Sequence, residues 1–145
     1  MEEVVVDASV VAKWYLVEPY REEALKLRDD YVSGYVSLVA PALLPFEVLN
    51  AIRYSKRKIE ERQLVEISLS LLLYGIKLHH PTAEYFEEVA RASLRNGITV
   101  YDAAYVALAK NKEIVLYTAD EKLVEKLNDE YRKYVKHIRE YDKGH

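Results

Sequence analysis

The residues of this chain with the clearest chemical potential are acids placed where strands end and helices begin. They are Asp7, Glu47, Asp102 and Asp120. Asp7 directly follows the β-branched run at residues 4–6, and Asp120 comes shortly after the unbroken apolar run at residues 114–117. Strands that are covered by helices on both faces read as continuous apolar runs, and ligands bind in the crevice beyond their carboxyl ends. The four carboxylates are therefore expected to converge on one crevice.

Such a cluster would repel itself, because like charges that share a site cannot all ionise without cost. A hard divalent cation removes this repulsion. Mg²⁺ prefers oxygen ligands in octahedral geometry and keeps several bound waters, and Mn²⁺ is its close substitute. The chain has no cysteine and only four histidines, so any metal must be held mainly by oxygen. The sequence thus predicts a Mg²⁺ or Mn²⁺ site.

Each acid also has an interpretation that involves no ligand. Asp is a preferred N-cap residue, so Asp7 could simply cap the helix that follows it, with Ser9 sharing that role. Glu47 could merely complement the positive end of a helix dipole. From the sequence alone, both interpretations stay open.

The other two acids raise the same question. Thr99 and Asp102 have the spacing of a capping box, which favours Asp102 as an ordinary helix-start acid. Thr118 and Glu121 have this spacing as well, and their capping box would leave Asp120 free for another role.

Alternating strand and helix patterns predict the fold. Apolar runs predict strands near residues 4–6, 35–40, 76–79, 114–117 and 135–138, with helices between them, the first over residues 8–17. Strands that alternate with helices favour an α/β fold, here a three-layer sandwich with a mostly parallel central sheet. The length fits a single domain over residues 1–145.

Composition narrows the location and the partners. The first three residues carry two acids, and no apolar run approaches the roughly 20 residues that cross a membrane. We therefore expect a cytoplasmic protein without a signal peptide or membrane anchor. The net charge of -3 argues against a chain that coats nucleic acid by bulk electrostatics. One Met, no Cys and 31% charged residues suggest a thermophilic source.

Binding to nucleic acid would need a local basic patch, and the densest one lies at the end of the Glu47 helix. It contains Arg53, Lys56 and Arg57. Any one of them could be a solvated side chain or a partner of the helix C-terminus, but as a group they are the natural candidates for holding phosphates.

The helix expected at residues 60–74 carries a wide apolar arc. Its apolar residues at core spacing are Leu64, Ile67, Leu71 and Leu72, with Leu69 and Leu73 beside them. This arc is wider than one interface requires, which indicates a helix between the core and a partner, such as the second copy in a homodimer.

Four motifs, in this order along the chain, resemble a known family. They are Val-Asp-Ala-Ser at residues 6–9, Glu47 on its helix, Thr-Val-Tyr-Asp-Ala-Ala-Tyr at residues 99–105 and Tyr-Thr-Ala-Asp-Glu-Lys-Leu at residues 117–123. Together they resemble the PIN domain, and most closely the VapC-type toxins of toxin-antitoxin modules, over essentially the whole chain.

The resemblance implies an endoribonuclease that depends on Mg²⁺ or Mn²⁺ and leaves 3'-hydroxyl and 5'-phosphate ends. The residues that match the family's acidic quartet are Asp7, Glu47, Asp102 and Asp120. Thr118 matches the family's hydroxyl residue before the last acid, and Asn50 matches a polar position after the helical Glu. The resemblance also implies a homodimer that is neutralised by a small antitoxin protein, often through a basic side chain in the acidic site.

The expected mechanism follows from these assignments. Bound metal would lower the pKa of a water, which attacks an RNA phosphodiester. Asp7 and Asp102 are the main expected ligands, and the other two acids complete the metal site or orient the water. Ser9, Asn50 and Thr118 are expected to orient the ligands.

Three alternatives remain open. A phosphatase or receiver-type domain also uses an Asp at a strand end with Mg²⁺, but the phosphatase signature has a second Asp at the position of Ser9. In a non-catalytic interaction module, the acids would serve only as caps. A PIN nuclease of RNA maturation would need the same acids as a toxin, and a neighbouring gene for a small DNA-binding protein would distinguish the toxin.

Overall fold

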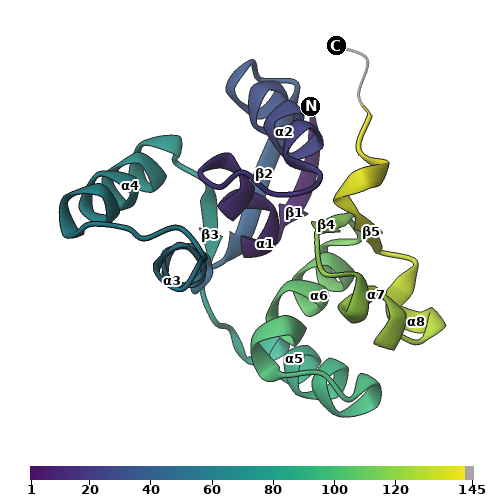
Figure 1. Ribbon diagram of the computed structural model, residues 1–145. Helices are drawn as coiled ribbons and strands as arrows, with labels where there is room; N and C mark the ends of the chain where they lie inside the picture. The colour runs from purple at the N-terminus through teal and green to yellow at the C-terminus, as the bar shows by residue number, and fades with distance from the viewer. Residues whose placement is uncertain (143–145) are drawn as a thin grey trace.

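A five-stranded sheet lies at the centre of the computed structural model, which describes residues 1–142 (Figure 1). The strands are β1 Glu2–Val6, β2 Val36–Pro41, β3 Lys77–His79, β4 Leu116–Thr118 and β5 Val135–His137. They follow the order β3-β2-β1-β4-β5, and each neighbouring pair is parallel. The last three residues of the expected domain, 143–145, lie outside the described residues.

Helices cover both faces of the sheet. The first half of the chain contains α1 Ala8–Val11, the 3-10 turn η1 Ala12–Trp14, α2 Arg21–Val32, α3 Leu44–Arg53 and α4 Glu61–Tyr74. The second half contains α5 Ala83–Asn96, α6 Val100–Lys112, α7 Glu121–Lys126, α8 Asp129–Arg132 and the 3-10 turn η2 Ile138–Glu140. In Figure 1, α1 and α2 lie on one side of the sheet and α5 and α6 on the other. The predicted three-layer α/β fold is confirmed.

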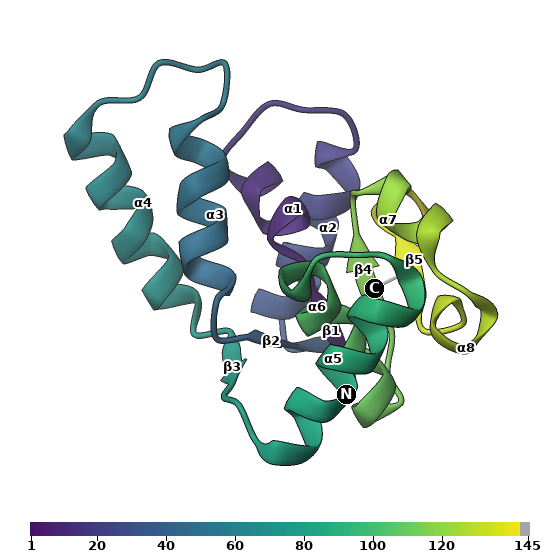
Figure 2. The ribbon, with the colours of Figure 1, turned by 90° about the horizontal axis from the view of Figure 1, so that it is seen from below.

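The helices α3 and α4 run side by side as a hairpin that stands at the β3 end of the molecule (Figure 2). The α4 helix begins at a capping box between Glu60 and Gln63 and ends at Gly75, whose φ is 64°. Within residues 1–142, no helix is long and apolar enough to cross a membrane.

The strand order reverses between β1 and β4. The chain first adds strands on one side of β1, and it then returns to add β4 and β5 on the other side. Because parallel crossovers are right-handed, this reversal places the two sets of helices on opposite faces of the sheet. Ligands of such sheets bind outside the carboxyl ends of the strands at the point of reversal. Any residue that follows β1 or β4 therefore lies at the favoured ligand position.

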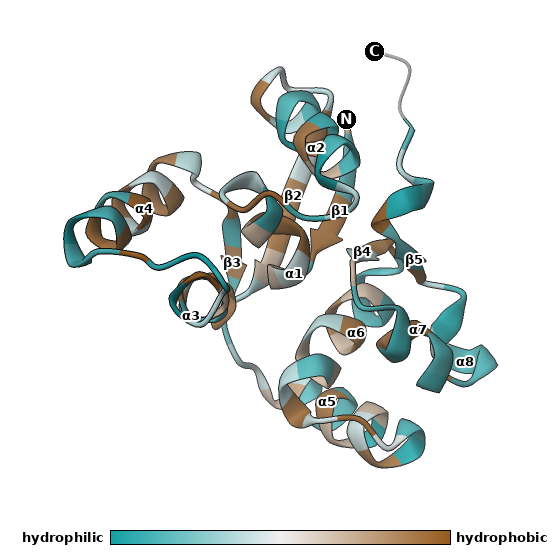
Figure 3. Cartoon of the chain, viewed as in Figure 1, coloured by the Kyte–Doolittle hydropathy of each residue, from teal (hydrophilic) through white to brown (hydrophobic). Residues whose placement is uncertain are grey.

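The core runs along β1, β2 and α6, and the apolar residues of β1 and β2 stand out in Figure 3. Residues 4–6 are almost completely buried, as expected for a strand with helices on both sides. Ala103, Ala104 and Ala107 are buried on α6, where their small size allows close packing. An ion pair, termed here the α5–α6 ion pair, joins Nζ of the partly exposed Lys110 to Oε1 of the buried Glu88 at 2.5 Å.

Two local predictions were wrong. The first helix does not extend over residues 8–17, because α1 ends at Val11 and the tighter η1 turn then ends at Trp14. The Trp14 indole donates a hydrogen bond to the carbonyl oxygen of Ala24. Leu72 was expected at a core position, but it is 77% exposed, because α4 is covered on the side of α3 and only Leu71 is fully buried.

Candidate active site

Asp7 lies directly after β1 at the point where the strand order reverses, and its carboxylate is held by two hydroxyl groups. Ser9 Oγ donates to Asp7 Oδ2 at 2.6 Å, and Thr118 Oγ1 donates to the same oxygen at 2.8 Å. The register that pairs Val6 with Tyr117 brings Thr118 next to Asp7. Asp7 occupies the N-cap position of α1, but its side chain makes no capping hydrogen bond. The interpretation of Asp7 as a simple helix cap is therefore wrong.

The same hydroxyl groups connect Asp7 to the chain after β4. Ser9 Oγ accepts from the backbone N–H of Ala119 at 2.9 Å, and Thr118 Oγ1 accepts from that of Asp120 at 3.1 Å. These bonds fix the turn on which Asp120 sits. Ser9 and Thr118 thus both contact the Asp7 carboxylate, and their role in orienting a metal ligand stays a prediction.

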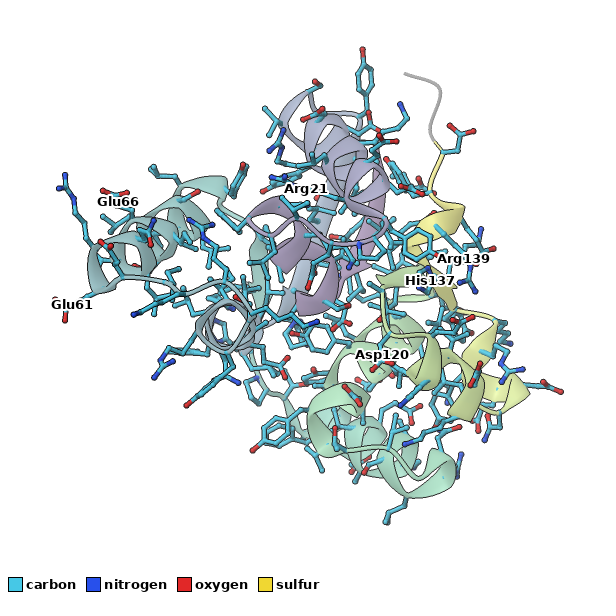
Figure 4. The ribbon with its side chains drawn as sticks, viewed as in Figure 1. Arg21, Glu61, Glu66, Asp120, His137 and Arg139 are labelled. Carbon is cyan, nitrogen blue, oxygen red and sulfur yellow. The ribbon has the colours of Figure 1, made fainter. Side chains whose placement is uncertain are left out.

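Asp120 is itself the N-cap of α7. Its Oδ1 accepts from the backbone N–H of Leu123 at 3.1 Å. The predicted capping box between Thr118 and Glu121 is wrong, because Thr118 lies within β4 and its hydroxyl is already shared between Asp7 and the Asp120 N–H. One carboxylate oxygen of Asp120 still remains outside this bond. In Figure 4, Asp120 points toward the middle of the molecule, whereas Glu61 and Glu66 lie apart from it on α4.

Glu47 lies in the first turn of α3, and its carboxylate is bound by a buried tyrosine. Tyr105 Oη donates to Glu47 Oε1 at 2.6 Å, which joins α3 to α6. The sequence reasoning missed Tyr105. Two features of the sequence could have pointed to Tyr105. It lies one helical turn after Asp102, and it is a large side chain in a stretch that is rich in alanine. The interpretation of Glu47 as only a partner of the helix dipole is therefore incomplete.

Asp102 lies in the first turn of α6. The hydroxyl of Thr99 accepts from the backbone N–H of Asp102 at 3.0 Å, so Thr99 caps α6 as the spacing predicted. The cap uses the backbone of Asp102 and leaves its half-buried carboxylate available.

The four carboxylates influence one another electrostatically. Burial, and then the charges of Glu47 and Asp102, raise the pKa of Asp7 from 3.8 to about 6, against the effect of its two hydroxyl donors. Burial and the charge of Asp102 raise the pKa of Glu47, and burial and the charge of Asp120 raise the pKa of Asp102. The charges of these acids therefore interact, and burial together with the neighbouring charges makes ionisation of Asp7, Glu47 and Asp102 less favourable.

The carboxylate oxygens at this site suit a hard cation, although the carboxylates do not lie close enough together to form a complete set of metal ligands. Among residues 1–142, no group of three or more acidic, histidine or cysteine side chains is close enough to hold a metal. Mg²⁺ does not need such a group, because it is usually bound through one or two carboxylates and retains several waters. Repulsion between the unneutralised carboxylates also favours their separation. Asp7 and Asp102, with Glu47 and Asp120 beside them, fit a site of this kind.

A groove of about 970 Å³ extends from this cluster to the basic patch and is termed here the Ser9–Arg57 groove. Ser9 and Asp120 line one end, and Lys56 and Arg57 line the other. Arg53 does not line it, because its guanidinium lies over the ring of Tyr54 at 4.8 Å.

Asn50 is exposed on α3, and its side chain makes no hydrogen bond within the described part of the chain. The expected contact from Asn50 to the acids is therefore absent among residues 1–142.

Comparisons with known proteins agree with this fold and site. A family model for the PIN domain matches residues 4–127. Ribonuclease VapC3 of Pyrobaculum aerophilum is 36% identical over 127 residues, which cover 84% of this chain and 92% of that protein.

Two solved structures have the same fold. The crystal structure of PAE2754 from Pyrobaculum aerophilum has a TM-score of 0.61 at 23% identity, covering 95% of this chain and 90% of that chain. VapBC2 from Rickettsia felis, bound to a DNA fragment from its promoter, has a TM-score of 0.58 at 12% identity, covering 93% and 98%.

Two findings define the class of the protein. Its parallel sheet has acids at the point where the strand order reverses, and a family model covers most of its sequence. The chain belongs to the PIN domain family. The predicted resemblance to PIN domains of the VapC type is thus confirmed, and Ribonuclease VapC3 is among the proteins to which it is similar.

Proposed function

We propose that this protein is an endoribonuclease that depends on Mg²⁺ or Mn²⁺ and acts as the toxin of a toxin-antitoxin pair. The observation that carries the proposal is the buried Asp7 carboxylate, held by two hydroxyl groups and faced by other acids, in a PIN domain similar to a ribonuclease. A carboxylate with a raised pKa at a ligand position is a candidate functional group on physical grounds.

The side chains have distinct roles in this proposal. Asp7 and Asp102 would hold the ion, and Glu47 and Asp120 would complete its surroundings or orient the attacking water. Ser9, as well as Thr118 and Tyr105, keeps the carboxylates in place through the hydrogen bonds described above. A divalent ion bound there would make a water more acidic and would offset negative charge on the phosphate during hydrolysis.

An antitoxin partner is supported by the apolar outer surface of α4. The exposed residues of this surface are Val65, Leu69, Leu72 and Leu73. A contiguous patch of exposed apolar residues usually marks a surface that binds a partner, because soluble monomers rarely expose large patches of this kind. We infer that a small antitoxin protein covers this part of the molecule.

We also infer a homodimer, for which a second apolar surface is available. Phe86 of α5 and Val100 and Tyr101 at the start of α6 are each more than half exposed, and they line an apolar pocket of about 230 Å³. Because this surface is on different helices from the α4 surface, a dimer and an antitoxin complex are compatible.

The decisive experiment is cleavage of a labelled single-stranded RNA pool of random sequence by the purified protein in Mn²⁺. We expect cutting that EDTA abolishes and that Asp7→Asn reduces by at least 100-fold. The matched control is Asp129→Asn, an exposed acid of α8, which should cut like the wild type. Cutting that survives both EDTA and Asp7→Asn would contradict the proposal.

A second measurement addresses the toxin role. Expression of the wild-type protein in a host cell should arrest growth, and expression of Asp7→Asn should not. Equal growth arrest by both proteins would show that toxicity does not come from the acidic site.

A further inference from the structure

A lysine lies almost buried next to the acidic cluster, and the roles proposed above leave it unused. Lys13 belongs to η1 and is 8% exposed, yet it lines the Ser9–Arg57 groove together with Ser9 and Asp120. Arg21 Nε donates to the carbonyl oxygen of Lys13 at 3.1 Å, which helps to hold this turn in place.

Among residues 1–142, the ammonium group of Lys13 pairs with the carboxylate of Glu18. Lys13 Nζ lies 3.3 Å from Glu18 Oε1, and the Glu18 side chain is 41% exposed on the loop between η1 and α2. Asp120 lines the same groove as the lysine. His137 of β5 is also near Lys13, because the Lys13 charge helps to lower the pKa of His137, after the larger effects of burial and Arg139. In Figure 4, His137 and Arg139 lie together on the side of Asp120 that is away from α4.

The shape and the lining of the groove suit a single strand of RNA. Lys13 lies at the end near the acids, and Lys56 and Arg57 lie at the other end. Tyr54, which is 73% exposed, also lines the groove. Grooves that bind single strands combine positive charges for the backbone with aromatic rings on which bases stack.

We propose that Lys13 binds a backbone phosphate of the RNA strand next to the bond that is cut, and that Glu18 competes with this phosphate for the Lys13 ammonium. The inference rests on the proposed nuclease function and adds a substrate-binding residue to it. In the free protein, Glu18 neutralises a poorly solvated ammonium. In the complex, a phosphate oxygen takes the place of the Glu18 carboxylate.

Removal of the Lys13 charge and removal of the Glu18 charge should change the RNA affinity in opposite directions, although the two residues form one ion pair. If the pair only supported the fold, removal of either charge would weaken the protein and its binding in the same direction. If Lys13 binds phosphate, loss of its charge weakens RNA binding, whereas loss of the competing Glu18 charge strengthens it.

The test is fluorescence anisotropy of a labelled 20-nucleotide single-stranded RNA in EDTA, over a range of salt concentrations. We expect Lys13→Met to bind roughly fivefold more weakly and to lower the slope of log affinity against log salt by about 0.7, the value for one phosphate contact on a single strand. Glu18→Gln should bind more tightly than the wild type. Lys13→Arg should recover most of the binding. The matched control is Lys77→Met, an exposed lysine at the start of β3, which should leave both quantities unchanged.

Cleavage of the random RNA pool in Mn²⁺ is measured in parallel, with thermal unfolding as a check on folding. We expect Lys13→Met to raise KM more than it lowers kcat. Wild-type cutting with equal RNA affinity in Lys13→Met, or weaker binding in Glu18→Gln, would overturn the role of Lys13 alone. Failure of the wild type to cut would instead refute the nuclease function, and the anisotropy would still decide whether Lys13 binds RNA.

Discussion

Replacement of Asp7 by asparagine should stabilise the metal-free protein at neutral pH, although it should abolish the proposed activity. Both hydroxyl donors bind the same oxygen of Asp7, so the amide oxygen of an asparagine can accept both hydrogen bonds. The amide nitrogen would then replace the other oxygen and would carry no charge. Asp7→Asn therefore removes a buried charge and keeps the hydrogen bonds that position it.

The size of the effect follows from the pKa of Asp7, which burial raises from 3.8 to about 6 in the folded protein. The folded state holds the proton more tightly than the unfolded state, so the wild type loses stability as pH rises from about 4 to about 6, and this loss is complete above that window. At 1.36 kcal/mol for each pKa unit, the loss is roughly 3 kcal/mol. Asp7→Asn should recover this amount at pH 7.5 and almost none of it at pH 3.5.

Thermal unfolding in EDTA at these two pH values measures the difference. For a chain of this length, about 3 kcal/mol corresponds to a rise in Tm of roughly 6 to 12 °C at pH 7.5. The control Asp129→Asn changes an exposed acid and should shift the free energy of unfolding by less than about 0.5 kcal/mol. A wild type that is as stable as Asp7→Asn at pH 7.5, or more stable, would refute the argument that Asp7 carries an unneutralised charge.

Three further variants test individual contacts. Thr118→Val removes a hydroxyl donor that lowers the pKa of Asp7, so the acidic limb of the pH–rate profile should move up by about one pH unit, whereas Thr118→Ser should leave it in place. Tyr105→Phe frees the Glu47 carboxylate and should weaken Mn²⁺ binding roughly 10-fold or more in a calorimetric titration; an unchanged affinity would show that Glu47 needs no orientation. Glu88→Gln removes one charge of the α5–α6 ion pair, but Lys110 is partly exposed and keeps Glu130, so the free energy of unfolding in urea should fall by about 1.5 kcal/mol, and an unchanged value would contradict the pairing.

The sequence allowed the sheet and the positions of the acids to be predicted, because both depend on short patterns. An apolar run of strand length that ends at Asp7 indicates a buried strand and the side of the sheet at which its acid emerges. The same reasoning placed Asp120 correctly at the end of β4, but it assigned the wrong cap to α7. Which oxygen caps a helix depends on the backbone path between strand and helix, and both the Thr118 hydroxyl and the Asp120 carboxylate in that turn could have served.

Contacts that join distant parts of the chain could not be predicted in this way. Tyr105 binds Glu47 across 58 positions of sequence, and a single sequence contains no signal for that pairing. No pattern in the sequence singled out Lys13, because its burial in η1 is a property of the tertiary structure. The exposure of Leu72 depends on how many neighbours α4 has, which is a property of the tertiary structure.

Three acids are deeply buried among residues 1–142, namely Asp7, Asp30 and Glu88, and the differences between them bear on function. Glu88 is 5% exposed and is neutralised by Lys110 at 2.5 Å. Asp7 is 8% exposed, but its hydrogen-bond partners are the hydroxyl groups of Ser9 and Thr118, which cannot neutralise it, and the nearby acids raise its pKa further. An acid kept only for packing would gain stability from a cationic partner or from replacement by a neutral residue. Asp30 is also buried with only a tyrosine hydroxyl as its side-chain partner in the described part of the chain, so what distinguishes Asp7 is its place at the point of strand reversal beside other acids. The unneutralised charge of Asp7 at that place is best explained as a binding site for a positive ligand, whose binding would return the stability that the charge removes from the free protein.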